Sequence, residues 1–320
     1  MAEEAGLGRA GALKTMDRVP HLRNYSVEGK LARRHAFLVE EAGLGWAGAA
    51  KAITGDPKVL GYSVRKNLRP ATRFLVEELG LGKDGAAKLI TTLPQVLGLS
   101  VDYNLAPKVR YLAEDLGLGR DGAVKVITRF PSVLSMSVEN NIAPKVRYLA
   151  EEVGLGNAGA AKFITKCPQV LGMSVDDNIA PKVRYLAEEL GLGRAGTAKV
   201  ITKFPPVLGL SVEDNIGPKM RFLSEHFPDT DVAKMVRNLS PRSLAGRLVP
   251  RVRLLQRHSQ AGRFAATTIG RLTDETFCEK VGITIEEYND EVAACVRECA
   301  EKQPSPGGGG GGASAGEIDG

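Results

Sequence analysis

The chain has 320 residues, of which 43% are hydrophobic and 25% charged, and its formal net charge is +6. This is the composition of a globular protein, and no run approaches the roughly 18 consecutive apolar residues of a membrane-spanning helix, which excludes that class. Four cysteines are too few for a disulfide scaffold and favour a reducing compartment. The positive charge is a mild indication of an anionic partner.

Two sets of prolines recur along the chain with a period of 37 residues. The serines that precede a valine keep the same period, from Ser26 to Ser211. Self-similarity at a period between about 20 and 50 residues is typical of solenoids. The first proline set is Pro20, Pro57, Pro94, Pro131, Pro168 and Pro205, and the second is Pro70, Pro107, Pro144, Pro181 and Pro218.

The first helix of each repeat carries a stripe of apolar residues at helical spacing, which predicts one buried face. The serine before it, such as Ser100, is suited to N-cap the helix. Two starts remain open: the helix begins at Ser100 and Pro107 kinks it, or it begins at Pro107 itself. The stripe of this repeat consists of Leu105, Val109, Leu112 and Leu116.

A second helix follows over about Asp121 to Phe130, and Pro131 ends it. The Pro-x-Val-Leu segment after it is long enough for only one turn, of the 3₁₀ type. No segment shows the alternating pattern of a strand. The sequence therefore predicts an all-α fold, an α-solenoid of repeats of about 37 residues, each with two helices and a short 3₁₀-like turn.

The ends of the array differ from its middle. Residues 2–8 match the end of a first helix, so the chain opens in mid-repeat. We expect a repeat and a targeting peptide to be missing, rather than a first helix pair left uncapped. The repeat array is predicted over 1–227, basic, degenerate repeats with a helical cap over 228–303, and a Gly-rich disordered tail over 304–320.

Each repeat contains a G-x-G-x-x-G motif, for example from Gly117 to Gly122. A dinucleotide site requires this motif to follow a strand and to open a helix. Here it follows a helix, and glycine accepts the left-handed conformation that terminates helices. We therefore interpret the glycines as helix-ending turns and expect no cofactor.

The cysteines near the C-terminus resemble a zinc site only loosely. Cys295 and Cys299 are four residues apart, but structural zinc sites need a second close pair of ligands, and none is present. Buried free thiols are the simpler interpretation. With four histidines and no repeated acid-base pair, the sequence offers no catalytic constellation, so we predict no enzyme and no metal site.

The positive charge is concentrated near the C-terminus. Between Asp229 and Leu272, nine basic residues stand against two acidic ones. Because arginine makes forked contacts with phosphate, this segment predicts nucleic-acid binding; a solvated or internally paired arginine face is the alternative. The strongest candidate contacts are Arg242, Arg247, Arg251, Arg253 and Arg257.

Two further rows of basic residues follow the repeat, and a solenoid would carry each row as a line, about 10 Å or roughly three base pairs per repeat. For either row the alternative is an ordinary exposed helix face. The recurring aromatics lie beside the apolar stripe, which favours packing over base stacking and a duplex over a single strand. The second-helix row is Lys88, Lys125, Arg129, Lys162, Lys166, Lys199 and Lys203, and the first-helix row is Lys108, Lys145, Lys182 and Lys219.

One resemblance to a known family is carried by two parts of the unit, Ser-Val-x-x-Asn-Ile-x-Pro-Lys-Val-Arg-Tyr-Leu-x-Glu-x-Leu-Gly and Ile-Thr-x-x-Pro-x-Val-Leu. This unit resembles the mitochondrial transcription termination factor family over residues 1 to about 300, including Leu-Thr-Asp-Glu-Thr-Phe before Cys278. The resemblance implies a left-handed helical solenoid with kinked first helices. It also implies binding of double-stranded nucleic acid along a basic groove, in mitochondria or plastids, although no transit peptide is recognisable here.

We therefore expect a non-enzymatic, monomeric helical-repeat protein that binds double-stranded nucleic acid and regulates organellar gene expression through transcription or its termination. Its expected partners are double-stranded DNA or structured RNA and the organellar transcription or ribosome machinery, with no membrane. Two alternatives remain open: an organellar RNA-processing or ribosome-assembly factor that binds structured RNA, and a protein-interaction scaffold.

Overall fold

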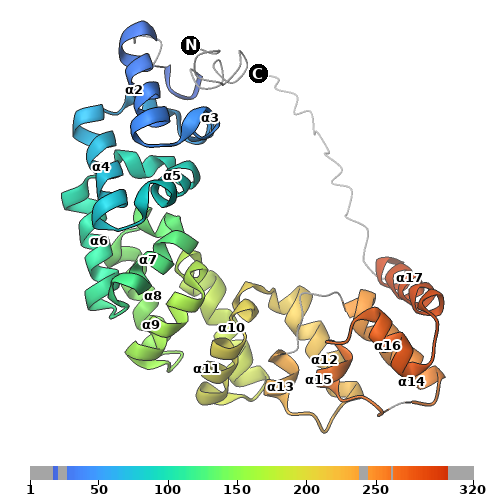
Figure 1. Cartoon of the computed structure of the whole chain (residues 1–320). Helices are drawn as coiled ribbons and strands as arrows, with labels where there is room; N and C mark the ends of the chain where they lie inside the picture. The colour runs from blue at the N-terminus through green and yellow to red at the C-terminus, as the bar shows by residue number, and fades with distance from the viewer. Residues whose placement is uncertain (1–16, 21–26, 238–243, 261, 302–320) are drawn as a thin grey trace, which may run out of the picture. The chain divides into compact units, whose positions relative to one another are not determined.

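The structure is a computed structural model that describes residues 17–20, 27–237, 244–260 and 262–301. Every regular element in these ranges is helical, as the sequence predicts. Pairs of helices follow one another along the chain (Figure 1). The opening residues 2–8, Arg242 and the Gly-rich segment from residue 304 lie outside the described residues.

From Ser63 to Ser211, the first helix of each repeat begins at the serine, so the proline lies inside it. The Ser100 hydroxyl accepts a hydrogen bond of 3.3 Å from the Tyr103 amide and caps a helix that starts at Val101. The first turn is wide, because the Leu105 amide donates to the carbonyl of Ser100, five residues back, at 3.0 Å. This wider turn gives the ring of Pro107 room beside the preceding carbonyls, so the helix continues past it.

These first helices, called helix A below, combine π-helical turns with a central α-helical part. The earliest spans Val27–Leu31, α2 (Ala32–Ala36) and Phe37–Glu41. The next two span Val64–Leu68, α4 (Arg69–Arg73) and Phe74–Glu78, then Val101–Leu105, α6 (Ala106–Arg110) and Tyr111–Asp115. The last three span Val138–Ile142 and α8 (Ala143–Glu151), then Val175–Ile179, α10 (Ala180–Arg184) and Tyr185–Glu189, then Val212–Ile216 and α12 (Gly217–His226).

The second helices, called helix B below, are more uniform, and each ends before a proline that opens a 3₁₀ turn. They are α3 (Gly45–Gly55), α5 (Gly82–Thr92), α7 (Gly119–Arg129), α9 (Gly156–Lys166) and α11 (Gly193–Lys203). The 3₁₀ turns are Pro57–Gly61, Pro94–Gly98, Pro131–Ser135, Pro168–Gly172 and Pro205–Gly209. The predicted repeat of two helices and a short turn is therefore confirmed.

The glycines between helix A and helix B each have a local geometric reason. Gly117 and Gly119 have φ angles of 72° and 66°, in the left-handed region that side chains rarely adopt. A Cβ atom on Gly122 would lie 2.8 Å from the Cβ of Leu118. The motif thus ends one helix and starts the next, which confirms the interpretation of these glycines as helix-ending turns.

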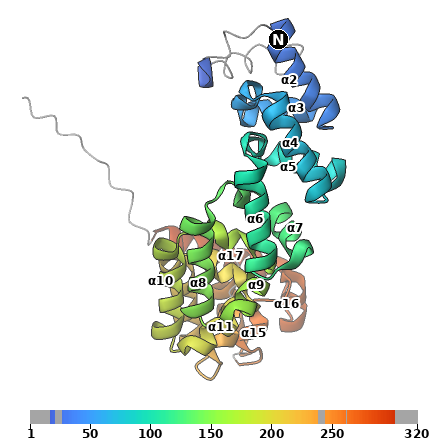
Figure 2. The same ribbon diagram turned by 90° about the vertical axis from the view of Figure 1, so that its left-hand side faces the viewer.

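The chain divides into two compact units, Met1–Pro181 and Lys182–Gly320. Within the first unit, α4, α6 and α8 follow one another in one layer and α5, α7 and α9 in a second (Figures 1 and 2). Most of the apolar stripe of helix A faces the second layer: Leu105 and Leu112 are fully buried and Leu116 nearly so, whereas Val109 is half-buried. Each such burial stabilises the fold by roughly 1.5–3 kcal/mol.

The second unit ends in a group of helices that depart from the repeat. These are α13 (Val232–Arg237), the turn Leu244–Leu248 with α14 (Val249–Arg257), α15 (Ala266–Ile269), α16 (Asp274–Val281) and α17 (Ile285–Glu301). Helices α16 and α17 fall where the sequence predicts a helical cap. The domain boundary expected near residue 227 stays a prediction, since the two compact units divide within α10.

Candidate nucleic-acid interface

Helix B carries one exposed lysine at the same position of successive repeats. Lys88 on α5 is exposed, whereas Leu89 and Ile90 beside it are buried, because successive helical residues point about 100° apart. Among the residues that the structure describes, no hydrogen bond or ion pair holds these ammonium groups, so they are available to an anion. The corresponding exposed lysines are Lys125, Lys162 and Lys199.

Sequence reasoning overlooked one member of this row in the first unit. Lys51 on α3 is exposed and stands 37 residues before Lys88. The repeat period alone would have found it. With Lys51 included, the first unit carries this lysine in four consecutive helices B.

The helices B of the first unit are basic as a group. Together α3, α5, α7 and α9 contain eight lysines and arginines against two aspartates, Asp84 and Asp121. Both aspartates lie in the first turn of their helix, one turn before the exposed lysine. In α9 an exposed alanine, Ala158, takes that position, so the charge of Lys162 has no carboxylate one turn before it.

The threonines on the same helix face as the exposed lysines donate their hydroxyl protons to carbonyls of their own helix. The Thr165 hydroxyl donates to the Ala161 carbonyl at 3.0 Å, and the Thr91 hydroxyl donates to the Ala87 carbonyl at 2.8 Å. A hydroxyl that has given its proton to the preceding turn cannot donate it to a phosphate in the same conformation. The lysines, not the threonines, therefore supply the donors of this surface.

The basic residues near the end of helix B also donate hydrogen bonds to the next repeat. Exposed Arg129 donates to the carbonyls of Thr165 and Lys166 at 3.4 and 3.5 Å, and Arg18 donates in the same way to Thr54 at 2.8 Å. These carbonyls lie at the end of the following helix B, where they lack a helical partner. Lys166 and Lys203 are exposed at the corresponding positions.

The helix A lysines are buried, which corrects the sequence-based expectation that they form a surface row. The ammonium group of Lys108 donates to the Leu134 carbonyl at 2.7 Å and to the side chain of Asn104. Burial lowers the pKa of Lys108, as it does for the other three lysines. Lys108, Lys145, Lys182 and Lys219 are only 8%, 8%, 8% and 3% exposed, so they cannot reach a phosphate.

One sequence signal could have revealed this burial. An asparagine stands four residues before each of these lysines, and for Lys108, Lys145 and Lys219 its side chain accepts a bond from the ammonium group. Asn141 accepts from Lys145 at 2.5 Å and Asn215 accepts from Lys219 at 2.8 Å. The Asn-x-x-x-Lys spacing is that of two side chains on one helix face.

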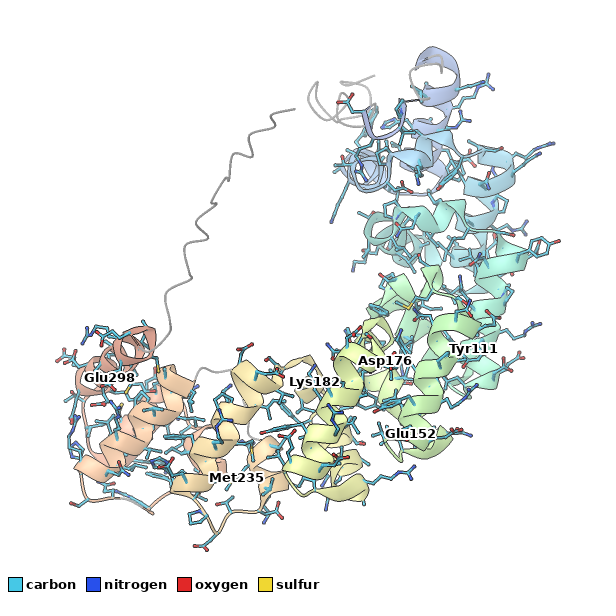
Figure 3. All side chains as sticks on the ribbon, turned by 180° about the vertical axis from the view of Figure 1, so that it is seen from behind. Tyr111, Glu152, Asp176, Lys182, Met235 and Glu298 are labelled. Carbon is cyan, nitrogen blue, oxygen red and sulfur yellow. The ribbon has the colours of Figure 1, made fainter. Side chains whose placement is uncertain are left out.

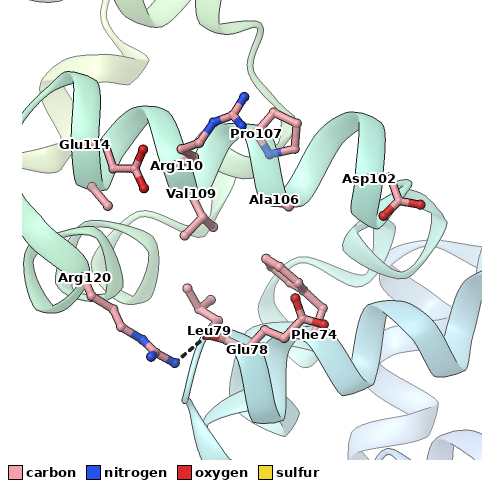
Figure 4. A pocket seen from close by; sticks show the side chains of 11 residues that line it. Phe74, Glu78, Leu79, Asp102, Ala106, Pro107, Val109, Arg110, Glu114 and Arg120 are labelled. Atoms are coloured by element: carbon pink, nitrogen blue, oxygen red, sulfur yellow. Dashed lines mark hydrogen bonds between the residues drawn. The ribbon is translucent and has the colours of Figure 1, made fainter.

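The helix A over residues 101–115, whose lysine is buried, exposes three carboxylates, Asp102, Glu114 and Asp115, beside one arginine, Arg110. Between the turn Phe74–Glu78, which follows α4, and α6 lies a groove of about 560 Å³ (Figure 4). Its arginine Arg120 donates at 2.6 Å to the backbone carbonyl of Glu78. The charged residues that line this groove are Glu78, Asp102, Arg110, Glu114 and Arg120. Carboxylates repel a phosphate backbone, so in this repeat the exposed lysine of helix B is the better candidate for contact with nucleic acid.

The two innermost C-terminal arginines are part of the core of the second unit. Arg251 is fully buried and Arg247 is 8% exposed, and both donate to the Asp274 carboxylate, at 2.6 and 2.8 Å. The Arg251 guanidinium also lies 4.8 Å from the ring centre of Phe277 and 5.7 Å from that of Tyr288. Neither arginine can contact a phosphate from this position, which corrects the expectation for both.

The other two C-terminal arginines are paired within the protein. Arg253 makes a two-pronged ion pair with Glu298, with bonds of 2.9 and 2.8 Å, and Arg257 pairs with Glu291 at 2.5 Å. The side-chain bond to Glu298 is the main cause that raises the pKa of Arg253. The alternative of an internally paired arginine face is therefore the one that the structure bears out for these residues. The fifth candidate, Arg242, lies outside the described residues.

The cysteines do not assemble a metal centre in the described ranges. No three His, Cys, Asp or Glu side chains gather there as a metal ion would need. Cys278 and Cys295 are buried free thiols, and burial raises the pKa of both. Cys295 lies 3.4 Å from the Arg253 guanidinium, on the side of α17 that faces α14.

Residues 3–278 match the family model of mTERF. The chain belongs to the mTERF family. The family consists of helical-repeat proteins, in agreement with the fold, and membership assigns this mTERF protein to the nucleic-acid-binding proteins of gene expression. No curated protein matches the chain.

Two general properties of mTERF proteins bear on this one. They are generally non-enzymatic, and they are typically organellar. Within the described parts of this mTERF protein, no helix is both long and apolar enough to cross a membrane. The match ends at Cys278 in α16, so α17 lies beyond the matched residues.

Proposed function

We propose that this mTERF protein binds double-stranded nucleic acid without enzymatic activity, as a monomer, through the exposed lysines of helix B, and so regulates transcription or its termination in an organelle. One observation carries the proposal: Lys51, Lys88, Lys125 and Lys162 recur at one exposed position of the first unit and have no partner among the described residues. Lys199 holds the same position in the second unit.

The spacing of these lysines fits a phosphate backbone. Neighbouring helices lie about 10 Å apart, and a duplex rises about 3.4 Å per base pair, so each repeat would advance by roughly three base pairs. Because the repeats present near-identical lysines, this contact would read the backbone rather than the bases. In the repeat whose helix A spans residues 101–115, the exposed carboxylates would favour contact on the helix B side.

The test is the salt dependence of duplex binding, measured by fluorescence anisotropy with a mixed-sequence DNA duplex. Each lost phosphate contact flattens the slope of log affinity against log salt by about 0.9. We expect Lys88→Gln, Lys125→Gln and Lys162→Gln together to flatten it by roughly 2.7.

The matched control removes three exposed positive charges from helix A, with Arg110→Gln, Arg147→Gln and Arg184→Gln. This control should keep the wild-type slope. Equal effects of the two triple variants, or no binding of the wild type near 100 mM salt, would refute the proposal. Repeating the titration with an RNA hairpin and an RNA–DNA hybrid distinguishes a transcription role from RNA processing or ribosome assembly.

A further inference from the structure

Helix α17 places a line of carboxylates against the basic helix α14. Glu291 and Glu298 face α14, and Glu287 lies 2.8 Å from His258, the residue that follows α14. Glu291 contacts Arg257 at 2.5 Å and Arg253 at 3.5 Å. Helix α17 contains six acidic residues and one arginine, whereas α14 contains three arginines and no acidic residue.

The arginines in this contact remain at the surface. The side chains of Arg253 and Arg257 are 39% and 56% exposed, in contrast to fully buried Arg251. Glu298, on the last described helix (Figure 3), is 43% exposed, and Glu291 is 7% exposed. A ligand in solution can therefore approach both guanidinium groups without any opening of the core.

The contacts on Arg253 are of the kind that a phosphate would make. Glu298 accepts two parallel bonds from its guanidinium, which is the forked geometry that arginine offers to carboxylate and phosphate alike. A carboxylate and a phosphodiester oxygen thus compete for the same donors. Tyr288 and Cys295 are 2% exposed and anchor α17 in the unit, so the helix keeps its carboxylates in place.

We propose that α17 is an internal competitor of nucleic acid: Glu291 and Glu298 occupy Arg253 and Arg257, which form a second phosphodiester-binding site on α14 when those carboxylates are displaced or neutralised. The ligand class rests on the proposed function above. The residues matched by the family model end at Cys278, before α17.

The test neutralises the competing carboxylates in the full chain. The double variant Glu291→Gln, Glu298→Gln should bind a mixed-sequence DNA duplex about tenfold more tightly, with a salt slope steeper by about 1.8, because two phosphate contacts are added. The matched control, Glu286→Gln with Asp290→Asn, removes two exposed negative charges from the same helix and should change affinity far less. Equal gains in the two double variants would overturn the proposal.

A second pair of variants tests whether the arginines are already occupied. Arg253→Gln with Arg257→Gln should leave duplex binding of the otherwise unchanged protein within about twofold, because these arginines are already occupied. The same pair should abolish the gain of the Glu291→Gln, Glu298→Gln protein. A large loss from the arginine variants alone would show that they already bind nucleic acid and would overturn the proposal.

The helix B variants separate this inference from the proposed function. If Lys88→Gln, Lys125→Gln and Lys162→Gln weaken binding while the α17 variants change nothing, the proposed function stands and the competitor role is wrong. If the wild type binds no duplex but the α17 double variant does, the competitor role stands and the lysine row is not sufficient.

Discussion

The ammonium group of Lys108 donates a hydrogen bond of 2.7 Å to the carbonyl oxygen of Leu134, 26 residues further along the chain. Lys108 belongs to helix A of one repeat, and Leu134 belongs to the 3₁₀ turn that leads into the next helix A. Asn104 accepts a second bond from the same group. The lysine therefore ties consecutive repeats together instead of forming part of their surface.

Replacing this tie should weaken the repeat array. We expect Lys108→Met to lower the free energy of unfolding by about 1–3 kcal/mol, because the buried Leu134 carbonyl loses its donor. Urea unfolding followed by circular dichroism measures the change. The control Lys125→Met removes an exposed lysine from helix B and should stay within about 0.5 kcal/mol. Equal losses would show that the bond contributes nothing specific.

Asp274 is the acceptor on which the buried arginines depend. It receives bonds from Arg247 at 2.8 Å, from Arg251 at 2.6 Å and from the Tyr288 hydroxyl at 3.0 Å. Asp274→Ala leaves a fully buried guanidinium without its counter-charge, so we expect a loss of about 3–5 kcal/mol in the stability of the second unit. Thermal unfolding detects it, and Glu275→Ala, at the exposed neighbour, should have little effect.

The buried phenol of Tyr288 makes stability depend on alkaline pH. Burial is the main cause that raises its pKa to about 12, although Arg251 acts in the opposite direction. The folded state therefore keeps a proton that the unfolded state, with a tyrosine pKa of about 10, has lost. The free energy of folding that comes from this protonated phenol is fully present below about pH 10 and is lost as the pH rises to about 12.

The unfolding free energy measured against pH tests this expectation. The wild type should lose stability across that window more steeply than Tyr288→Phe, which has no proton to lose. Parallel pH curves for the two proteins would contradict the assignment.

The thiols of α17 should differ in reactivity. Burial raises the pKa of Cys295 to about 11, opposed by Arg253, whereas Cys299 is exposed. Because the thiolate is the reactive form, iodoacetamide near neutral pH should modify Cys299 well before Cys295. Mass spectrometry of timed digests measures the two rates. In urea the rates should become similar, and a difference that persists there would not come from the fold.

The aspartate before Lys125 should weaken its contact with a duplex. Asp121 lies one turn before this lysine and reduces the local positive potential. We expect Asp121→Ala to tighten duplex binding by about twofold, which corresponds to the few tenths of a kcal/mol typical of such a charge pair. Anisotropy titration at low salt resolves this change. Asp115→Ala, on helix A, should have a smaller effect, and the reverse order would place the duplex on the helix A side.

The local pattern of the chain was sufficient to predict the helices. Serine caps, paired prolines, helix-ending glycines and apolar spacing act within a few residues of one another, so they are readable without neighbours. Of the predicted stripe, Leu105, Leu112 and Leu116 are buried, whereas Val109 is half-buried and lines the groove beside α6; Tyr111 is also half-buried. The start of helix A at Ser100 was open because only the wide turn before Pro107 shows how the proline fits.

By itself the sequence determined an all-α repeat array, its period, its family and the lysine row of helix B, because each follows from residues spaced regularly along one chain. Only the tertiary structure decided which charges reach solvent. Lys108 meets the carbonyl of the next repeat, Arg251 meets Asp274, and Arg253 meets Glu298 on α17. The partners of these charges lie 23 to 45 residues away, and the energy of a charge depends on the partner that folding brings to it.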